Sequence, residues 1–497
     1  AAESHDFLNL TTTRGFENGA ECRPIIMGVD ASIWMYQADG AITHRNARAG
    51  PNPQLRVLFY RLATLLQLPL RAVFVFDGPG RPQFKRNTRV VTRGNRLTTE
   101  FRELIGQFGY HSHMAPAEAD AELGRLASEH IVDVVETTDS DVLLFGAPTV
   151  LYIPRKKQDR NKVMLYTAEN VFITPGVGLT RGGLLLIALL SGGDYNPGIS
   201  GCGIITAHAI ARGNLGDMLL TEALRSHTLT PRFIEFLNTW KEVLCLEFST
   251  NAHGFLAQRR PAIAAAIAQL PSFPDPDVIF AYVHPITSWS ENHSPPDYQA
   301  WGLSQPNLTK ITSLCQRQFG WDAATIAKKF YKLLFLGIAT QSLLKPYNLH
   351  ALLEAHVEMG FSSDDDFPRS SVLRVLKDKT TGALKFYRVE MSTRALSLHV
   401  RAGLHTATAS PGPTLMAHWI PAPIIDYALP DLVSRSQALA RLNASKSRSQ
   451  RKVKSAANGP APVRVPPQTV VSVPTHLCRA YQFAQSSSAL TATRSPC

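Results

Sequence analysis

Seven acidic residues each stand at the end of an apolar run or in the turn just after one. They are Asp30, Asp77, Glu118, Asp120, Asp139, Asp141 and Asp194. Their surroundings read MGVDAS, VFVFDG, PAEADAEL, VVETTDSDVLLFG and LLSGGDY. If they met in one place, seven carboxylates would repel each other by several kcal/mol unless cations neutralised them. The set as a whole therefore indicates a metal site of the kind that hydrolyses phosphodiesters with two ions.

Taken singly, these acids have commoner explanations. Asp139 and Asp141 are two apart at an expected strand end, where both side chains can point to one face. A lone DxD is more often a solvated strand end with an Asx turn. Glu118 and Asp120 would diverge by about 200° inside a helix. At a helix N-terminus just after Pro116 they can converge, although helix capping alone is the commoner role.

The elements that must position these acids alternate between strand and helix. Short apolar or β-branched runs at 23–30, 71–77, 131–136 and 149–153 predict strands, and the patterns at 53–68 and 117–130 predict helices. This alternation predicts a mostly parallel sheet, whose ligands bind beyond the carboxyl ends of the strands. Asp30, Asp77 and the Asp139/Asp141 pair fall at those ends, so the strand pattern and the acid positions agree.

The segment SGGDYNPGISGCGIITAHAIAR interrupts a helical region at 180–225 with an acid, two turns and a helix start. Gly201 and Gly203 permit positive φ and close backbone approach. Amides and carbonyls of such a hairpin can hold a phosphate, often through a monovalent cation. A plain helix–helix loop is the alternative. Asp194, which precedes these glycines, favours the phosphate-binding hairpin.

A basic run follows Asp77 in RPQFKRNTRVVTRGNR. It contains Lys85, Arg86, Arg89, Arg93 and Arg96. Charge runs are usually solvated faces, but Pro79, Gly80 and Pro82 indicate a loop over the acids. Basic residues above an acid cluster suit a phosphodiester with metal ions beneath it.

Bulk properties narrow the class of protein less sharply. The chain has 497 residues, a net charge of +12 and a pI of about 9.5, which suggests a polyanionic partner. Eight of those charges lie in 443–497, which has no acid, so the charge alone does not indicate DNA binding. Six cysteines without a CxxC pair predict reduced thiols, an intracellular protein and no zinc module. The longest apolar run, LLLIALL at 184–190, is too short to span a bilayer and predicts a buried helix.

The second half of the chain changes character twice. Residues 226–360 are largely helical in pattern, with proline breaks. At 370–430, LRVLKD, FYRVEM and SLHVRAGL alternate before WIPAPIIDYALPDLV, which predicts a small β-rich module closed by a helix. From about 443 the chain is rich in Ser, Pro, Ala and basic residues, which predicts disorder. The cluster SKSRSQRKVK within it is compatible with nuclear import or with non-specific DNA affinity.

In this order, the acidic segments resemble the XPG/flap-endonuclease superfamily over roughly residues 20–215. The part with Asp30 and Asp77 looks like its N-terminal region. APAEADAELGRL through TDSDVLLFGA looks like its I-region, and LLSGGDYNPGISGCG looks like its third acidic motif with a helix–two-turn–helix. Asp120 stands where the family usually carries Glu. Only 41 positions separate Asp77 from Glu118. This short connection resembles the GEN/Yen Holliday-junction resolvases of fungal type, as do WGLSQPNLTKITSLCQRQFGW and the chromodomain-like FYRVEM.

The resemblance implies an α/β fold with a mostly parallel twisted sheet flanked by helices, a PIN-like nuclease core. It divides the chain into a core at 1–225 with a helix–two-turn–helix at about 195–215, a helical extension at 226–365, a chromodomain-like module at 366–435 and a disordered basic tail at 436–497. Family chains start with an MGVxGLW-type segment that packs by the active site and touches DNA. This chain starts AAESHDFLNL, which is no signal peptide and lacks Met, so we expect a fragment or processed form that begins downstream of that segment.

The resemblance implies a phosphodiesterase, namely a structure-selective 5′ endonuclease that cleaves branched DNA. It also implies two Mg²⁺ ions about 3.5–4 Å apart, which Mn²⁺ can replace. By resemblance, Asp30, Asp77, Glu118 and Asp120 lie at the first ion, and Asp120, Asp139, Asp141 and Asp194 lie at the second. Lys85, with Arg86 or Arg93, would polarise the phosphate.

The resemblance also implies which partners the chain has and where it acts. DNA would meet Gly201, Gly203, Ile204, Thr206 and Arg89. A K⁺ ion at the helix–two-turn–helix, a homodimer on a four-way junction and nuclear localisation are compatible with it. No PCNA-binding box is evident, and no membrane contact is expected.

Two other functions remain open from the sequence. A 5′-flap or gap endonuclease would share every active-site residue with a resolvase. A catalytically weak protein that binds DNA junctions is the alternative from another class, motivated by the chain's start and opposed by the complete set of acids.

Overall fold

The computed structural model describes residues 1–17, 22–43, 50–82, 84–85, 88–89, 96–154, 159, 161–345, 369–404, 412–439, 441–442 and 445. Residues 1–437 form one compact unit, and 438–497 form a second. The predicted tail from 443 lies outside the described residues except for position 445. Residues 430–439 are helical, so the helical part of the chain extends past position 435, where the predicted module ends.

A seven-stranded sheet organises the first 170 residues. Its strands in spatial order are β1 (Glu3–Asp6), β9 (Lys162–Thr167), β8 (Thr149–Tyr152), β7 (Val134–Glu136), β2 (Ile25–Asp30), β3 (Leu70–Phe76) and β6 (His111–Met114). The five from β8 to β6 are mutually parallel, while β9 and β1 pair antiparallel at one edge. The predicted α/β class with a mostly parallel sheet is therefore confirmed.

Four of these strands overlap the four predicted runs, but three others were not predicted. β6 reads HSHM and has no apolar pattern, so its place in the sheet comes from backbone pairing with β3. The predicted run 131–136 is too long, because strand β7 begins at Val134. Asp133 before it accepts hydrogen bonds from Arg23 Nη1 at 2.8 Å and from the Ile26 N–H at 2.6 Å.

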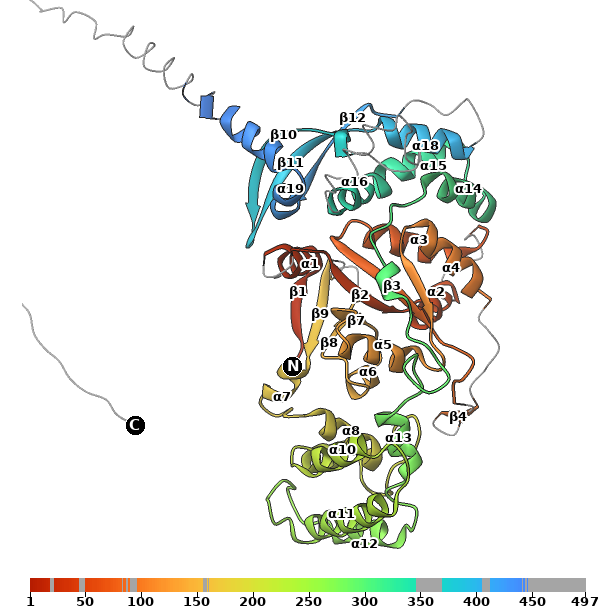
Figure 1. Ribbon diagram of the computed structural model, residues 1–497, viewed down its shortest axis with the longest axis vertical. Helices are drawn as coiled ribbons and strands as arrows, with labels where there is room; N and C mark the ends of the chain where they lie inside the picture. The colour runs from red at the N-terminus through yellow and green to blue at the C-terminus, as the bar shows by residue number, and fades with distance from the viewer. Residues whose placement is uncertain are drawn as a thin grey trace, which may run out of the picture. The chain divides into compact units, whose positions relative to one another are not determined.

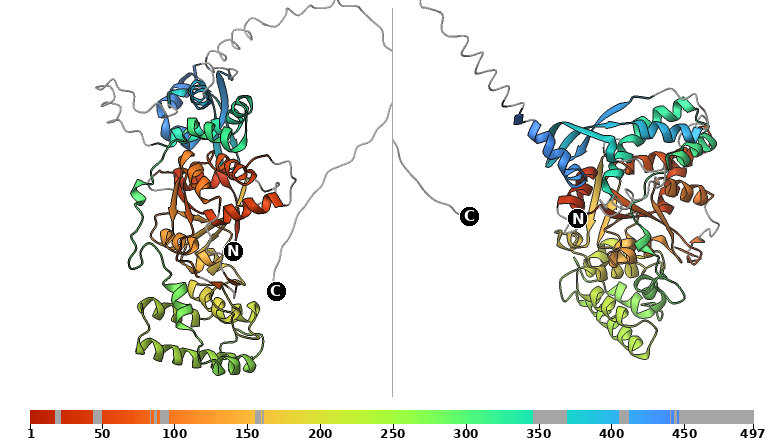
Figure 2. Two further views of the ribbon diagram at one scale, coloured as in Figure 1. Left: turned by 90° about the vertical axis from the view of Figure 1, so that its right-hand side faces the viewer. Right: turned by 45° about the horizontal axis from the view of Figure 1, so that its top comes forward.

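Helices cover both faces of the sheet (Figures 1 and 2). One core lies under α2 (Ala31–Thr43), α3 (Pro53–Leu65) and α4 (Thr98–Gln107), and it includes Met27, Phe59 and Phe74. The opposite face packs Val73 and Val75 against α5 (Ala119–Ser128) and α6 (Asp141–Leu144). Burial on both faces explains why the central strands read as nearly continuous apolar runs.

A second core is entirely helical. It is built by α8 (Arg181–Ser191), α9 (Ile204–Ala211), α10 (Leu215–Arg225), α11 (Pro231–Thr250), α12 (Pro261–Gln269) and α13 (Pro276–Val283). The run LLLIALL lies in α8, where four of its leucines are buried, so that prediction is confirmed. α13 packs back against α8 and α10. This return brings the end of α13 close to the turn that carries Asp194.

The region at 370–430 contains three antiparallel strands in the order β10 (Val372–Thr381), β11 (Leu384–Ser392), β12 (Leu415–Pro421), closed by α19 (Ala422–Ala428). The prediction that SLHVRAGL belongs to the β-rich part is wrong, because this segment lies in a helix, α18 (Arg394–Leu404). Leu396, Val400 and Leu404 are buried at a spacing of four, which is a helical period rather than strand alternation.

This β-rich region shares one hydrophobic core with the seven-stranded sheet. α18 packs on α14 (Leu308–Phe319), and a Cβ at Gly403 would come within 2.7 Å of the Thr309 carbonyl oxygen. Val389 and Ile424 belong to the same buried cluster as Phe59. Removing the region would therefore open that core, so point substitutions are better probes of it than deletion.

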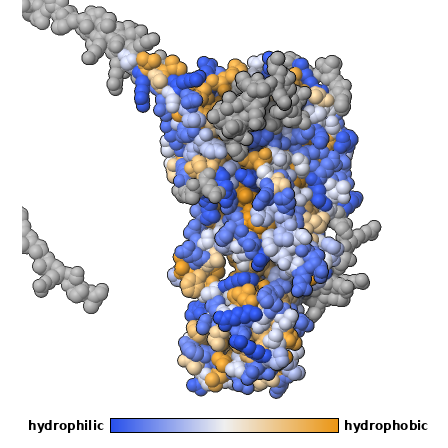
Figure 3. All heavy atoms as spheres, in the orientation of Figure 1, coloured by the Kyte–Doolittle hydropathy of each residue, from blue (hydrophilic) through white to orange (hydrophobic). Residues whose placement is uncertain are grey.

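The surface of the described chain is mixed in polarity. Hydrophilic residues cover most of the face drawn in Figure 3, with hydrophobic residues in patches between them. In the described residues, no helix is both long enough and apolar enough to cross a membrane.

Candidate active site

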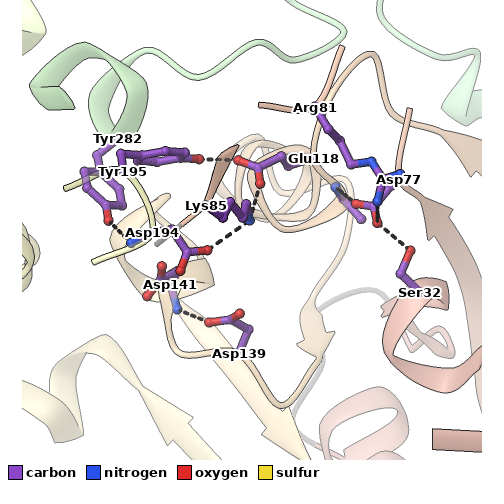
Figure 4. Close-up of polar contacts among 11 residues, drawn as sticks. Ser32, Asp77, Arg81, Lys85, Glu118, Asp139, Asp141, Asp194, Tyr195 and Tyr282 are labelled. Carbon is purple, nitrogen blue, oxygen red and sulfur yellow. Dashed lines mark hydrogen bonds and ion pairs between the residues drawn. The ribbon is translucent and has the colours of Figure 1, made fainter. Parts of the chain in front are cut away.

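The seven predicted acids meet at one edge of the sheet. Asp30 ends β2, Asp77 follows β3, Glu118 precedes α5 after β6, and the Asp139/Asp141 pair follows β7. These four strands are parallel neighbours, so their carboxyl ends meet at the same edge. Asp194 reaches the same place from the turn after α8, as the close-up in Figure 4 shows for five of the seven.

Asp30 is almost fully inaccessible to solvent, at 3% exposure. Its Oδ1 accepts the Ile33 N–H at 3.0 Å, which holds the carboxylate over the start of α2. The pKa of Asp30 is raised to about 7, mainly by burial; the Ile33 hydrogen bond opposes this shift, and the nearby charges of Asp77 and Glu136 add to it. A buried carboxylate with this pKa is costly to ionise unless a cation lies beside it.

Asp77 is held by a turn that fits closely against the start of α5. Its Oδ1 accepts the Ala119 N–H at 3.0 Å, and its Oδ2 accepts Ser32 Oγ at 2.8 Å and Arg81 Nη1 at 3.1 Å. A Cβ at Gly78 would lie 1.8 Å from the Ala115 carbonyl oxygen, so only glycine permits this approach.

Glu118 and Asp120 converge because they straddle a helix start. Glu118 is the extended N-cap residue of α5, and Asp120 is in its first turn. Burial raises the pKa of Asp120 well above its usual value, and Asp30 and Asp139 add to the effect while Lys85 opposes it. Asp120 Oδ1 is buried and has no hydrogen-bond partner among the described residues. The helix N-terminus thus places both carboxylates toward the cluster, as the sequence predicts.

Asp139 and Asp141 are not on a strand, because β7 ends at Glu136. Asp139 lies in the turn before α6, and its Oδ1 accepts the Asp141 N–H at 3.0 Å. The Thr137 hydroxyl accepts the Asp139 N–H at 3.1 Å. The Asx-type turn and the acid cluster, treated as alternatives from the sequence, are therefore both present.

Lys85 provides positive charge within the cluster. Its Nζ forms an ion pair with Glu118 Oε1 and another with Asp194 Oδ2, the latter at 2.9 Å (Figure 4). Burial by itself would lower the pKa of Lys85, but Glu118 and Asp194 outweigh it and raise the pKa above its usual value. The ammonium group therefore stays charged, and its single positive charge offsets part of the negative charge of Glu118 and Asp194.

The donor set suits divalent cations. It consists of oxygen ligands only, which Mg²⁺ prefers, and the pKa values of Asp30 and Asp120 are raised, a shift that a nearby cation would oppose. Within the described ranges, no three His, Cys, Asp or Glu side chains lie close enough to hold a metal as they stand. Lys85 occupies the space between Glu118 and Asp194, so its ammonium group stands where a cation would otherwise compensate these acids.

Among the side chains that it describes, the structure gives no contact between the other predicted basic residues and the acids. Arg86 and Arg93 lie outside the described residues. Arg89 pairs with Phe84 through the backbone of a short hairpin, β4 (Phe84–Lys85) with β5 (Thr88–Arg89). Arg81, which the sequence analysis did not select, forms the ion pair with Asp77. It is the first residue of the same basic run.

The segment between α8 and α9 forms two turns, as predicted. Gly201 has the positive φ that the sequence analysis allowed for, at +81°, whereas Gly203 has φ of −75° and Gly198, which was not selected, has φ of +79°. A Cβ at Gly201 or Gly203 would meet nothing within 4 Å, so the backbone there faces open space. Ile204 is exposed at the first turn of α9, and Thr206 is half-buried. The N-terminal amides of α9 are thus accessible to an external ligand.

Two family descriptions match the part of the chain that carries these acids. The XPG N-terminal domain matches residues 18–98, and the XPG I-region matches residues 109–194. Residues 18–194 therefore contain an XPG N-terminal domain followed by an XPG I-region. The I-region contains five of the seven acids, and the N-terminal domain contains Asp30 and Asp77.

Named members of the superfamily align with parts of the chain. Mouse DNA excision repair protein ERCC-5 is 28% identical over 240 residues, which is 48% of this chain and 18% of that protein. Flap endonuclease 1 of Methanocella arvoryzae is 28% identical over 237 residues, or 39% of this chain and 69% of that protein. The chain thus corresponds to less than a fifth of the excision-repair protein.

A solved structure resembles much more of the chain. The Holliday junction-resolving enzyme GEN1, in complex with product DNA and a Mg²⁺ ion, is 26% identical, with a TM-score of 0.66. The match covers 89% of this chain and 97% of that one. A second GEN1 complex, with Mg²⁺ and Mn²⁺ ions, has the same TM-score. The fold therefore extends the likeness well beyond the XPG regions.

Two tyrosines beside the XPG I-region were missed from the sequence. The Tyr195 hydroxyl donates a hydrogen bond to Glu118 Oε2. The Asp194 N–H donates a hydrogen bond to the Tyr282 hydroxyl oxygen at 3.0 Å. The two rings meet edge to face, with centroids 4.6 Å apart. Tyr195 stands next to a selected acid and could have been noticed. Tyr282 lies on α13, 88 positions after Asp194, and no local pattern indicates it.

Tyr195→Phe tests whether this hydroxyl positions Glu118. It removes one hydrogen bond to a buried carboxylate and keeps the ring contact with Tyr282. We expect the maximal cleavage rate to fall by about tenfold, since a hydrogen bond to a charged group contributes about 1.5–3 kcal/mol. Tyr298→Phe, on an exposed tyrosine outside the site, is the control. Equal rates for both variants in single-turnover assays would contradict the positioning role.

One further buried acid was also missed. Glu136 ends β7 and accepts the Trp34 Nε1–H at 2.6 Å. Burial raises its pKa to about 7, while the Trp34 bond and the nearby Arg61 oppose that shift. An acid inside an apolar strand is a visible signal, but its partner comes from α2 and is set by the fold.

Proposed function

We propose that this chain is a Mg²⁺-dependent, structure-selective endonuclease that cleaves branched DNA, with four-way junctions as its preferred substrate. The observation that carries the proposal is the convergence of all seven acids with Lys85 at one sheet edge. Seven carboxylates that converge at one place need cations, and a polyanionic substrate needs the same cations.

In the proposed mechanism, each group has a defined task. Asp30, Asp77, Glu118 and Asp120 would hold one Mg²⁺, and Asp120, Asp139, Asp141 and Asp194 would hold the second. When bound, the two ions supply Lewis-acid stabilisation of charge on the phosphate. Tyr195 and Tyr282 orient Glu118 and the Asp194 turn, and the turn at Gly78 holds Asp77 toward them. Mn²⁺ is expected to substitute for Mg²⁺.

Lys85 plays two parts in this proposal. In the structure it compensates Glu118 and Asp194. With Mg²⁺ bound to these acids, the Lys85 ammonium group would be available to a phosphate oxygen beside them. The rigid helix–two-turn–helix backbone at Gly201 and Gly203, with Ile204 and Thr206, contacts a DNA strand away from the cut, with K⁺ as a candidate bridging ion.

The preference for junctions is supported by two observations. The likeness to GEN1 extends over 89% of the chain, including the region after the XPG domains. The connection between Asp77 and Glu118 is short, which suits a substrate without a free 5′ end. The competing function is a 5′-flap endonuclease, and a weak junction-binding protein is the third.

Cleavage of labelled substrates distinguishes these functions. The chain should cut a four-way junction in Mg²⁺ at least about tenfold faster than a 5′ flap of the same sequence, at saturating enzyme. Faster cleavage of the flap would favour the flap endonuclease. Tight junction binding without cleavage in either Mg²⁺ or Mn²⁺ would favour the binding protein.

In this proposal, residues 1–225 form the nuclease core, 226–365 a helical extension and 366–435 a chromodomain-like module that binds DNA. The outer face of its sheet carries the relevant side chains. Lys379 Nζ lies 4.4 Å from the centroid of the Trp419 ring, and Lys377 Nζ lies 5.6 Å from it. Phe386 is half-buried on the same face, whereas Tyr387 is buried in the core. The chain's own lysines thus cover the aromatic ring that a methyl-lysine ligand would need.

Replacing Lys377 and Lys379 together by alanine should therefore weaken junction binding about three- to tenfold, and more so at low salt. The maximal cleavage rate should stay within about twofold, because both residues are remote from the acids. Titration of labelled junction at two salt concentrations checks this. Unchanged affinity, or tight binding of a trimethyl-lysine peptide by the double variant, would contradict the assignment.

The basic tail is assigned to nuclear localisation. It lies almost entirely outside the described residues, so this part of the proposal rests on SKSRSQRKVK alone. Truncation before Asn443 should leave the maximal cleavage rate within about twofold and abolish nuclear accumulation of a fluorescent fusion. A tail that only binds DNA would instead steepen the salt dependence, by about 0.9 per phosphate contact. Persistent nuclear accumulation after truncation would refute the import role.

A further inference from the structure

A buried acid on α5, Glu122, joins this helix to the segment that follows α13. Glu122 is fully inaccessible to solvent and lies one helical turn after Glu118. Its Oε2 accepts the Ser288 N–H at 2.9 Å. Its Oε1 accepts the Nε2–H of His113, which stands on β6, at 2.8 Å. We call these two hydrogen bonds the Glu122 latch.

The residues around Ser288 form a turn that packs against the core beneath α5. The Thr287 N–H donates to Ser290 Oγ at 2.9 Å, and the Ser290 N–H donates to the Thr287 carbonyl oxygen at 2.9 Å. Trp289 packs on the core that α5 covers, with the Arg125 guanidinium 5.6 Å from its ring centroid. Thr287 and Ser288 are almost fully buried. The latch is therefore an interior contact.

The latch also lies close in sequence to the tyrosine that holds the Asp194 turn. Ser288 follows Tyr282 by six positions, just past the end of α13. The Tyr282 hydroxyl accepts the Asp194 N–H at 3.0 Å (Figure 4). The Tyr282 ring packs on that of Tyr195, whose hydroxyl donates to Glu118. The contacts of the latch thus continue through α13 to two of the acids.

These two acids stand on opposite walls of the site. Glu118 lies on the wall formed by α5, and Asp194 lies on the wall held by α13. Lys85 forms ion pairs with both carboxylates, so their separation must stay within reach of one ammonium group. A buried carboxylate without hydrogen-bond partners is strongly unfavourable, so Glu122 holds the segment after α13 against α5.

We propose that Glu122 is a positioning residue that fixes the distance between the Glu118 wall and the Asp194 wall. The inference rests on the proposed endonuclease function and extends it to a residue outside the set of seven acids. Glu122 acts through Ser288 and Tyr282 rather than by contact with the substrate. Releasing the latch frees the end of α13, and the Tyr282 hydroxyl then leaves the Asp194 N–H.

Amide hydrogen exchange of the chain without DNA or Mg²⁺ measures the latch directly. Glu122→Leu keeps the buried volume filled and removes both hydrogen bonds. We expect it to speed exchange in a peptide over residues 192–196 about tenfold, because the Asp194 N–H loses its acceptor. Tyr282→Phe, which removes that acceptor itself, should give a similar increase. Exchange over α12 should stay unchanged in both variants.

Cleavage assays then connect the latch to the proposed reaction. Glu122→Leu should slow single-turnover cleavage of a four-way junction about tenfold and leave the dissociation constant for DNA within about twofold. Glu122→Gln keeps an acceptor for the Ser288 N–H, so it should cleave at no less than about half the unsubstituted rate. Glu122→Leu and Tyr282→Phe together should cost no more than the larger single loss, because both act through one hydroxyl.

Glu247→Leu is the matched control. Glu247 is also a buried acid paired with a histidine, because its Oε2 accepts the His253 Nδ1–H at 2.7 Å, but it lies near the end of α11 in the helical core. Its replacement should lower the thermal unfolding midpoint as Glu122→Leu does, yet leave cleavage and exchange over 192–196 within about twofold. If Glu122→Leu does not fold, Trp289→Ala removes packing from the same turn and should produce the same selective pattern.

The outcomes separate this proposal from the one on which it rests. If the unsubstituted chain cleaves no branched DNA, the proposed function fails, and the exchange pattern alone decides the latch. If Glu122→Leu slows cleavage while exchange over 192–196 stays unchanged, Glu122 does not act through Tyr282 and the inference is wrong. Equally faster exchange in every peptide, or losses that multiply to about a hundredfold in the double variant, would also refute it.

Discussion

Replacing Asp139 or Asp141 by asparagine should abolish cleavage while DNA binding survives or improves. Each change removes one carboxylate from the proposed second metal position but preserves side-chain size and the turn before α6. The loss of metal-borne charge stabilisation should lower the single-turnover rate by about a hundredfold or more. Affinity should not fall, because a negative charge beside the phosphate is removed. Rates at saturating Mg²⁺ and junction titrations in Ca²⁺ measure the two effects.

A matched control is Glu129→Gln at the far end of α5. Glu129 pairs with Arg125 at 2.8 Å on the surface, and exposed pairs of this kind contribute little to stability. It should cleave at the unsubstituted rate. If Asp139→Asn or Asp141→Asn keeps more than about a tenth of the rate at saturating Mg²⁺, these residues are not essential metal ligands.

Lys85→Ala should lower the cleavage rate far more than the affinity for DNA. Its ammonium group lies within the acid cluster and is the described basic group that contacts both Glu118 and Asp194. Without it, the cluster loses the ammonium group that is proposed to polarise the phosphate, so we expect the single-turnover rate to fall about 10- to 100-fold. The dissociation constant should change by less than about threefold, because one phosphate contact contributes only part of the binding.

The dependence on Mg²⁺ makes this prediction specific. If Lys85 competes with a metal ion for Glu118 and Asp194, its removal eliminates that competitor. The Mg²⁺ concentration at half-maximal rate should therefore not rise. Lys162→Ala, an exposed lysine paired with Asp159 at 3.5 Å, serves as the control. A variant that loses affinity but keeps its maximal rate would reduce Lys85 to a residue that only positions the phosphate.

Much of the candidate site follows from the sequence, for a simple geometric reason. Asp30 and Asp77 stand at the ends of apolar runs, and the ends of neighbouring parallel strands meet at one edge. Once the runs are identified as strands, their acids must be neighbours. The start of α5 could also be predicted from the sequence, because Pro116 and the acids after it indicate a helix N-terminus. The two turns around Gly198 and Gly201 need residues that tolerate positive φ, which the sequence displays.

Other features depend on contacts between segments far apart in the chain. Strand β6 has no apolar pattern and exists because β3 offers an unpaired edge. The last strand-like run, SLHVRAGL, is a helix because α14 provides a surface for Leu396, Val400 and Leu404, and local alternation could not reveal that partner. The hydroxyl of Tyr282 reaches the Asp194 backbone only because α13 folds back on α8. The bridge from Lys85 to Glu118 and Asp194, and the Glu122 latch, likewise each require three segments to meet. Sequence patterns report which face of an element is apolar, whereas tertiary packing decides which distant polar groups come to share a buried space.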